Sequence, residues 1–226
     1  MAKPGITAAD LDLAAEKIIR AEGGEPTFLN YSPAGAPYPF PAALCISIND
    51  EVVHGIPSED RVLMSGDVVS LDLGVTYEGF VTDAARTVVV GGDMSEDQKR
   101  LIDATKEALA GAAKKAVAGN HVGDIGAAIS AVAKKYHLGV VRELGGHGVG
   151  KRLHENPYIA NYGMPGKGAV LVEGMVVALE PIFVLGKPAV SIDPDGYTYR
   201  TQDGSLAAHF EDTFIIGKNG TEILTR

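Results

Sequence analysis

Apolar residues recur with the 3.6-residue period of an amphipathic helix in three stretches of the chain, 8–21, 101–117 and 123–137. Capping-box sequences, Thr7–Asp10 and Ser95–Gln98, precede the first two stretches and predict where these helices begin. The faces of the second and third stretches are rich in alanine, which indicates that these helices pack against a sheet.

Apolar runs outside the helical stretches predict β-structure. Strands are expected at Leu44–Ile48, in a hairpin within Val68–Val90 that turns near Tyr77–Gly79, at Met175–Leu179, and in a final hairpin of Leu206–Phe210 with Thr213–Ile216. Residues 30–43 contain several prolines with interleaved aromatic residues, which indicates either a rigid irregular connection or one wall of an apolar pocket.

Two carboxylates lie inside the predicted hairpin. Asp72 stands between Leu71 and Leu73, and Asp83 follows Phe80–Val81 on the return strand. Facing strands bring the two aspartates to one point. An unpaired carboxylate among such neighbours costs several kcal/mol, so we expect a cation beside them. Converging carboxylates are typical of sites for hard metal ions.

Three more side chains with ligand chemistry stand in similar surroundings. Glu180 follows the predicted strand Met175–Leu179, and Glu211 lies between the apolar halves of the final hairpin. His147 stands in the glycine-rich run Gly145–Gly150, which matches a phosphate-binding loop poorly because no Lys-Ser/Thr pair follows it. As a ligand loop the run is reasonable, since flanking glycines let the backbone approach an ion closely.

The negative charge of this set needs compensation. Each of these residues alone could equally be a metal ligand or a partner of Lys or Arg in an ion pair. The surrounding apolar segments, however, contain one obvious basic residue, Arg86. Two divalent cations would balance four adjacent carboxylates. Two such ions roughly 3.5–4 Å apart lower the pKa of a bridging water and polarise a carbonyl group. The set therefore predicts metal-assisted amide hydrolysis.

Two histidines remain outside this set. His54 lies between a valine pair and Gly-Ile-Pro, where tightly turned backbone fits a structural or a functional role. His154 follows His147 by seven residues in turn-rich sequence, so a loop would bring the two imidazoles together. Beside a metal pair, His54 and His154 are expected to donate hydrogen bonds to the scissile carbonyl group.

Composition and charge restrict the classes of function. The 226 residues are 46% hydrophobic with a net charge of −9, which disfavours a nucleic-acid partner because phosphate neutralisation needs clustered Lys and Arg. Cys45 is the single cysteine, so no intrachain disulfide is possible. No stretch resembles a secretion signal or reaches the roughly 18 apolar residues of a membrane span. We therefore expect a cytoplasmic protein without membrane contact.

The order of the candidate ligands, Asp, Asp, His, Glu and Glu, resembles that of the pita-bread metallopeptidases. The sequence is similar to the type I methionine aminopeptidases of peptidase family M24 over nearly its whole length, at Asn49–Pro57, Leu71–Gly91, Gly145–Pro157, Ala178–Phe183 and His209–Ile215. This resemblance implies an α+β pita-bread fold, in which a curved antiparallel sheet from two pseudo-twofold related halves holds a dinuclear metal site. It also implies a single catalytic domain over residues 1–226, with the family's usual first N-terminal helix missing.

The resemblance further implies the roles of particular residues. The implied ligands of two divalent ions (Co, Mn, Fe or Zn) are Asp72, Asp83, His147, Glu180 and Glu211, of which Asp83 and Glu211 bridge. Glu180 is also the implied proton shuttle, and His54 and His154 are the implied substrate-contacting histidines. The implied pocket for the methionine side chain falls at Phe40, Cys45, Leu153 and Tyr197. Leu153 stands where many relatives carry an aromatic residue, so the side-chain preference of the pocket stays open.

By this resemblance the chain removes the initiator methionine from polypeptides whose second residue is small. Nascent polypeptide N-termini are the implied partners, ribosome docking stays open, and the family favours a monomer. One alternative is an X-Pro-cleaving peptidase on the same fold, which normally carries a large additional N-terminal domain. Another is a non-catalytic pita-bread module that binds proteins or RNA, although such relatives generally lose metal ligands.

Overall fold

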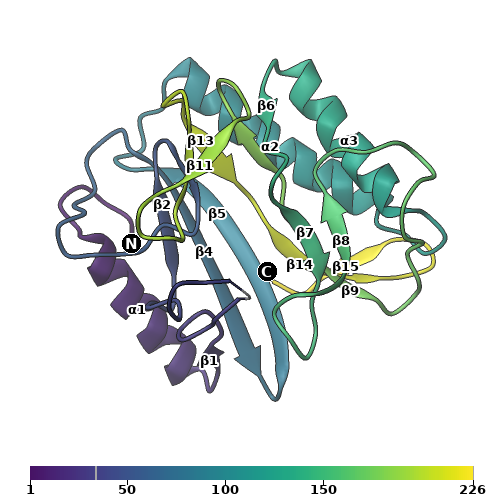
Figure 1. Cartoon of the computed structure of the whole chain (residues 1–226), viewed down its shortest axis with the longest axis horizontal. Coiled ribbons are helices and arrows are strands. Elements are labelled where there is room, and N and C mark those ends of the chain that lie inside the picture. The colour runs from purple at the N-terminus through teal and green to yellow at the C-terminus, as the bar shows by residue number, and fades with distance from the viewer. Residues whose placement is uncertain (34, 226) are drawn as a thin grey trace.

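The computed structural model describes residues 1–33 and 35–225. In this part of the chain three helices pack on the outside of antiparallel sheets (Figure 1). The helices are α1 (Ala8–Ala21), α2 (Glu96–Lys115) and α3 (Val122–Lys135). None of these described helices contains an apolar stretch long enough to cross a lipid bilayer.

The first two helices begin where their capping boxes predict. The Thr7 hydroxyl accepts a hydrogen bond from the Asp10 backbone N–H at 3.0 Å, and the Asp10 carboxylate accepts one from the Thr7 N–H at 3.1 Å. Ser95 and Gln98 make the same reciprocal pair at the start of α2. The predicted end of α2 at residue 117 is too late, because Ala116 leaves the helix with a ψ of 63°.

The predicted hairpin forms the centre of the N-terminal half. Its strands are β4 (Val68–Tyr77) and β5 (Phe80–Val89), which turn at residues 78 and 79 as expected. The outer strands β1 (Glu25–Pro26) and β2 (Cys45–Ile48) both pair with β4. Helix α1 packs on this sheet through a buried apolar cluster that includes Leu11.

The C-terminal half is built on a five-stranded sheet in the order β15-β14-β9-β7-β8. Its strands are β7 (Gly145–Gly148), β8 (Glu155–Ala160), β9 (Val176–Leu179), β14 (Asp212–Ile216) and β15 (Thr221–Ile223). Helices α2 and α3 cover its outer face (Figure 1), where Leu101 and Ile129 share a buried cluster with Val177 and Phe214.

Two smaller sheets complete the fold of the described residues. One has the order β13-β10-β6, and the other has the order β11-β12-β3. Their strands are β3 (Glu51–Val53), β6 (Gly139–Val140), β10 (Ile182–Val184), β11 (Val190–Ile192), β12 (Tyr199–Thr201) and β13 (Ala207–His209).

The predicted final hairpin is wrong in its pairing, although both strands exist. β13 pairs with β10, whereas β14 pairs with β9 and β15. Between β13 and β14, Glu211 makes a backbone bridge to Ala85 of β5, with N···O distances of 3.0 and 3.2 Å. The chain thus passes from one sheet to another at Glu211 and links the two halves there.

The glycine-rich run at residues 145–148 is an interior strand, so its prediction as a loop is also wrong. β7 lies between β8 and β9. A Cβ atom on Gly146 would lie 2.4 Å from the Ala178 carbonyl oxygen, and one on Gly148 would lie 2.2 Å from the Asn156 carbonyl oxygen. Glycine is therefore required for close strand packing beside His147.

Candidate active site

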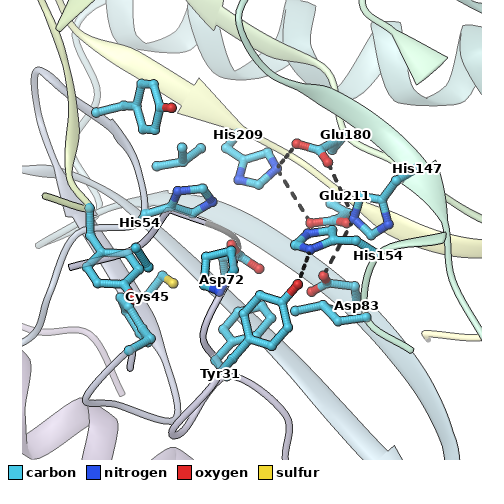
Figure 2. A pocket seen from close by; sticks show the side chains of 18 of the residues that line it. Tyr31, Cys45, His54, Asp72, Asp83, His147, His154, Glu180, His209 and Glu211 are labelled. Carbon is cyan, nitrogen blue, oxygen red and sulfur yellow. Dashed lines mark hydrogen bonds and ion pairs between the residues drawn. The ribbon is translucent and has the colours of Figure 1, made fainter. Parts of the chain in front are cut away.

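All the predicted site residues line one cavity of about 340 Å³, formed by side chains from both halves of the molecule (Figure 2). They are Phe40, Cys45, His54, Asp72, Asp83, His147, Leu153, His154, Glu180, Tyr197 and Glu211. The residues that the sequence analysis selected therefore lie together around one cavity.

Strand register explains how the carboxylates converge. Asp72 lies opposite Ala85, and Asp83 is two residues before Ala85 on the same strand, so both aspartates point to one face of the hairpin. The backbone bridge between Ala85 and Glu211 adds a third carboxylate to that face. Glu180 enters from the C-terminal half, directly after β9.

The ring of His147 is held in one tautomer by its own strand. Its Nδ1 lies 2.9 Å from the Gly148 carbonyl oxygen, which can only accept a hydrogen bond, so Nδ1 carries the proton. The other nitrogen, Nε2, lies 3.9 Å from the Asp83 carboxylate and 3.7 Å from the Glu180 carboxylate. Its lone pair is therefore available to a metal ion among these oxygens.

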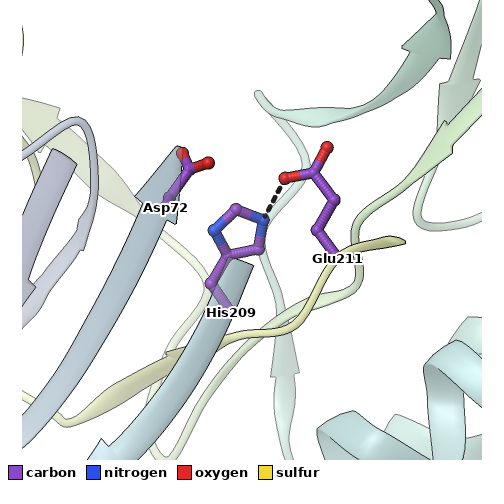
Figure 3. A group of neighbouring side chains, drawn as sticks. All are labelled: Asp72, His209 and Glu211. Carbon is purple, nitrogen blue, oxygen red and sulfur yellow. Dashed lines mark ion pairs between the residues drawn. The ribbon is translucent and has the colours of Figure 1, made fainter. Parts of the chain in front are cut away.

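A further imidazole, which the sequence analysis did not select, lies in the cluster. His209 Nε2 is 3.5 Å from the Glu211 carboxylate and 3.8 Å from that of Glu180. Figure 3 shows the ring between Asp72 and Glu211. In the sequence, His209 stands two positions before Glu211, and this spacing is the local feature that could have identified it as a site residue. The fold then shows that both side chains line the cavity.

The side chains form two overlapping groups with metal-ligand chemistry. Within each group the candidate ligand atoms all lie within 4.8 Å of one another. The groups are Asp72, His209 and Glu211, and Asp83, His147 and Glu211. Glu211 belongs to both groups.

Arg86 does not neutralise this cluster. Its guanidinium group pairs with Asp212 at 2.6 Å and also donates to the backbone carbonyl groups of Ala85 and Glu211. Among the described residues, no Lys or Arg side chain makes an ion pair with the four clustered carboxylates. Buried oxygens of Asp72, Asp83 and Glu211 have no hydrogen-bond partner there. Such orphaned acceptors fit the ligands of a cation.

Burial and mutual repulsion change the proton affinities of these groups. Burial raises the pKa of Asp83 to about 7, and burial together with the charge of Asp83 raises the pKa of Glu180 to about 8. The pKa values of Asp72 and Glu211 also rise well above their usual range, because both are buried among carboxylates. Divalent cations oppose these shifts by stabilising the charged forms. The cluster can therefore hold divalent metal.

The other end of the cavity is apolar. Phe40, Cys45, Leu153 and Tyr197 share one buried cluster, and the rings of Phe40 and Tyr197 meet edge to face with centroids 5.2 Å apart. Phe40, which comes from the proline-rich connection, thus supplies part of the pocket wall. Burial raises the pKa of the Cys45 thiol, which keeps it neutral as part of that wall. This end fits an apolar side chain.

A second cavity of about 450 Å³ adjoins the cluster and is more polar. It shares His54, His147, His154 and Glu180 with the first. Its remaining lining comes from Glu143, Leu144, Gly145, Arg152, Glu155, Asn156 and Tyr158. An extended ligand can therefore reach from the apolar pocket, past the carboxylates, into polar surroundings.

His54 is fixed at the junction of the two cavities by its backbone. Its φ of 60° lies in the left-handed region, and a Cβ on Gly55 would lie 2.1 Å from the Ile46 carbonyl oxygen. Its ring meets Tyr199 edge to face. Burial, with a smaller effect of His154, lowers the pKa of His54 to about 4, so the ring is neutral near pH 7.

Comparisons with known proteins agree with this arrangement. Residues 1–218 match metallopeptidase family M24. The chain is 47% identical over 225 residues to a methionine aminopeptidase of Aquifex aeolicus, covering 99% of this chain and 87% of that protein. It is also similar to the crystal structure of a Thermotoga maritima methionine aminopeptidase, with a TM-score of 0.94, 41% identity, and coverage of 100% of this chain and 88% of the other.

A more distant likeness concerns the X-Pro peptidases. A prolidase from Pyrococcus furiosus matches with a TM-score of 0.74 and 26% identity, covering 99% of this chain but 57% of the prolidase. The fold is thus shared, while similarity in sequence and length is greater to the methionine aminopeptidases. With its pita-bread fold and its cluster of buried carboxylates and imidazoles, the chain belongs to metallopeptidase family M24, among the methionine aminopeptidases.

Proposed function

We propose that this chain removes the N-terminal methionine from nascent polypeptides whose second residue is small. The observation that carries the proposal is the convergence of three buried carboxylates and the partly buried Glu180 with His147, without an ion pair to Lys or Arg among the described residues, beside an apolar pocket. The names and near-complete coverage of the similar methionine aminopeptidases support it.

The residues that would hold two divalent ions are Asp72, Asp83, His147, Glu180 and Glu211. The two overlapping ligand groups support a pair rather than a single ion. When bound, the pair supplies a water of lowered pKa and polarises the scissile carbonyl group. Carboxylate oxygens with imidazole nitrogen suit Mn, Fe, Co or Zn.

The side chains of the cavity then perform the hydrolysis around that chemistry. Glu180 accepts the proton of the attacking water and passes it to the leaving amine as the carbon–nitrogen bond breaks. His54 and His154 donate hydrogen bonds to the carbonyl oxygen as it gains negative charge. Both act as neutral donors, because burial lowers their pKa values.

The two cavities bind different parts of the substrate. Phe40, Cys45, Leu153 and Tyr197 hold the methionine side chain, and the second cavity accommodates the residues after the scissile bond. Leu153 is smaller than an aromatic residue, which leaves more room in the pocket wall. The side-chain preference is therefore a property to measure with methionine and norleucine peptides.

We further propose that the protein works as a monomeric single-domain enzyme in the cytoplasm, on polypeptides that emerge from the ribosome. The test is release of methionine from Met-Ala-Ser by metal-free protein reloaded with Co(II), Mn(II), Fe(II) or Zn(II). Turnover is expected only with metal, and Glu211→Ala should abolish it because this carboxylate belongs to both ligand groups. Normal turnover by that variant would refute the site.

Two outcomes would favour the alternatives. Faster cleavage of Ala-Pro-containing peptides than of Met-Ala-Ser would indicate an X-Pro peptidase. Failure to bind any divalent metal by elemental analysis would indicate a non-catalytic module.

A further inference from the structure

A tyrosine of the pocket loop contacts one of the two proposed donor histidines. The Tyr31 hydroxyl lies 2.7 Å from Nδ1 of His154, 123 residues away in the sequence, and the two rings meet edge to face with centroids 5.5 Å apart. Figure 2 shows this contact inside the cavity. Both side chains line the same cavity as the carboxylates.

The chemistry of the two groups decides which one donates. A neutral imidazole nitrogen is a stronger acceptor than a phenol oxygen, and a phenol is the more acidic donor. Above pH 7 an imidazole is mostly neutral and a phenol hydroxyl is protonated, so Nδ1 of His154 can accept and the Tyr31 hydroxyl can donate over the 2.7 Å between them. Within residues 1–33 and 35–225 the Tyr31 hydroxyl makes no other hydrogen bond. Tyr31 therefore donates to Nδ1.

We propose that Tyr31 is a positioning residue that holds His154 with its proton on Nε2. A neutral imidazole carries one ring proton, so a Nδ1 that accepts leaves the N–H on Nε2, which faces away from Tyr31. This leaves an N–H donor on the side of the ring away from Tyr31, as the proposed hydrogen bond to the scissile carbonyl group requires. The catalytic part of this inference rests on the proposed function.

The neighbouring histidine supports this assignment by contrast. The rings of His147 and His154 lie 4.5 Å apart at 76° to each other. His147 donates from Nδ1 to the Gly148 carbonyl oxygen and keeps Nε2 free as a ligand. His154 faces a hydroxyl instead of a carbonyl group and so takes the opposite tautomer. Two adjacent imidazoles are thereby prepared for different tasks, one as ligand and one as donor.

The tautomer is measured directly by ¹⁵N NMR of histidine-labelled protein, metal-free and loaded with diamagnetic Zn(II). Six histidines are present, and His154 is identified by the signal that disappears in His154→Ala. The expected spectrum has a protonated Nε2 and an unprotonated Nδ1, and Tyr31→Phe should give a mixture of both tautomers. A proton on Nδ1 in the wild type, or the same spectrum in Tyr31→Phe, overturns the proposal.

Kinetics with Met-Ala-Ser test the catalytic consequence. Tyr31→Phe should lower kcat roughly 10-fold, as expected for loss of an orienting partner, with KM within about threefold. The matched control is Tyr38→Phe, because the Tyr38 hydroxyl lies in the same loop but donates to the Asp195 carbonyl oxygen at 2.8 Å. This control should keep kcat within about twofold.

A double mutant shows whether Tyr31 acts through His154. In the His154→Ala background, Tyr31→Phe should change kcat by less than about twofold, because the group that it positions is absent. A full additional loss in that background contradicts the proposal. If the wild type releases no methionine, the proposed function fails, and the NMR experiment still decides whether Tyr31 fixes the tautomer.

Discussion

The guanidinium group of Arg86 lies 2.6 Å from the carboxylate of Asp212 and directs its charge away from the candidate metal cluster. Asp212 follows Glu211 directly, and Arg86 also donates to the Glu211 carbonyl oxygen. The one basic residue in the hairpin that is close to the site therefore anchors the backbone that carries Glu211. Arg86 therefore makes no ion pair with the carboxylates of the cluster.

Replacement of Arg86 tests this structural role. Arg86→Met leaves the buried Asp212 carboxylate without its cation and should lower the free energy of unfolding by about 1–3 kcal/mol, measured by urea denaturation. The lower end is favoured because the Arg86 side chain is 44% exposed and because Thr225 also donates to Asp212. Arg86→Met with Asp212→Asn should recover part of the loss. Equal stability of the single and double variants would contradict this account.

The pH dependence of metal-free protein follows from the raised carboxyl pKa values. Folded metal-free protein keeps Asp83 and Glu180 protonated up to about pH 7 and 8, whereas the unfolded chain releases these protons near pH 4. Since the folded state binds more protons in this window, its stability falls as pH rises. Burial lowers the pKa values of His54, His147 and His209 in the folded state. These histidines therefore make the stability rise with pH, but only below about pH 6.5, the pKa of a histidine in the unfolded chain.

Between about pH 6.5 and 8 the pH dependence of stability therefore comes from the carboxylates, without an opposing contribution from these histidines. There metal-free protein should lose about 2 kcal/mol of stability, seen as a falling Tm by calorimetry in the presence of a chelator. Added Mn(II) should restore more stability at pH 8 than at pH 6.5, because it stabilises the ionised carboxylates. A rising Tm of the metal-free protein over this window would show that the carboxylates do not control its stability.

His209 lies close enough to the carboxylates to influence the metal. His209→Gln should weaken Mn(II) binding roughly 10- to 100-fold, the usual cost of losing a ligand or its orienting neighbour, measured by titration calorimetry. His121→Gln makes the same chemical change at the start of α3, outside both cavities. It should leave the affinity unchanged. If both variants bind Mn(II) like the wild type, His209 plays no part in the metal site.

The close packing of β7 predicts opposite effects of two identical substitutions. Gly146→Ala places a Cβ 2.4 Å from the Ala178 carbonyl oxygen, so β7 and β9 must separate beside His147. It should cost about 1–3 kcal/mol in urea denaturation and reduce metal content. A Cβ on Gly111 in α2 would meet no atom within 4 Å apart from its chain neighbours and the backbone of its own helix. There Gly111→Ala should stabilise by about 1 kcal/mol through helix propensity. A Gly146→Ala variant as stable as the wild type would contradict the packing argument.

Elements whose signals are local could be predicted from the amino-acid sequence. The capping boxes mark the starts of α1 and α2, because both partners of each cap lie within four residues. The turn at residues 78 and 79 brings Asp72 and Asp83 together, since alternation along a strand and one tight turn are enough to place both on one face. Resemblance to the type I methionine aminopeptidases extended this to all the predicted residues that line the cavity.

The way in which distant segments meet became visible in the folded molecule alone. The fold separated β13 from β14, placed the glycine-rich run inside a sheet, turned Arg86 toward Asp212, and brought His209 and Tyr31 into the cavity. Each of these outcomes depends on packing between residues far apart in the chain. Local periodicity carries no information about such contacts, because many partners satisfy the same alternation of apolar and polar positions.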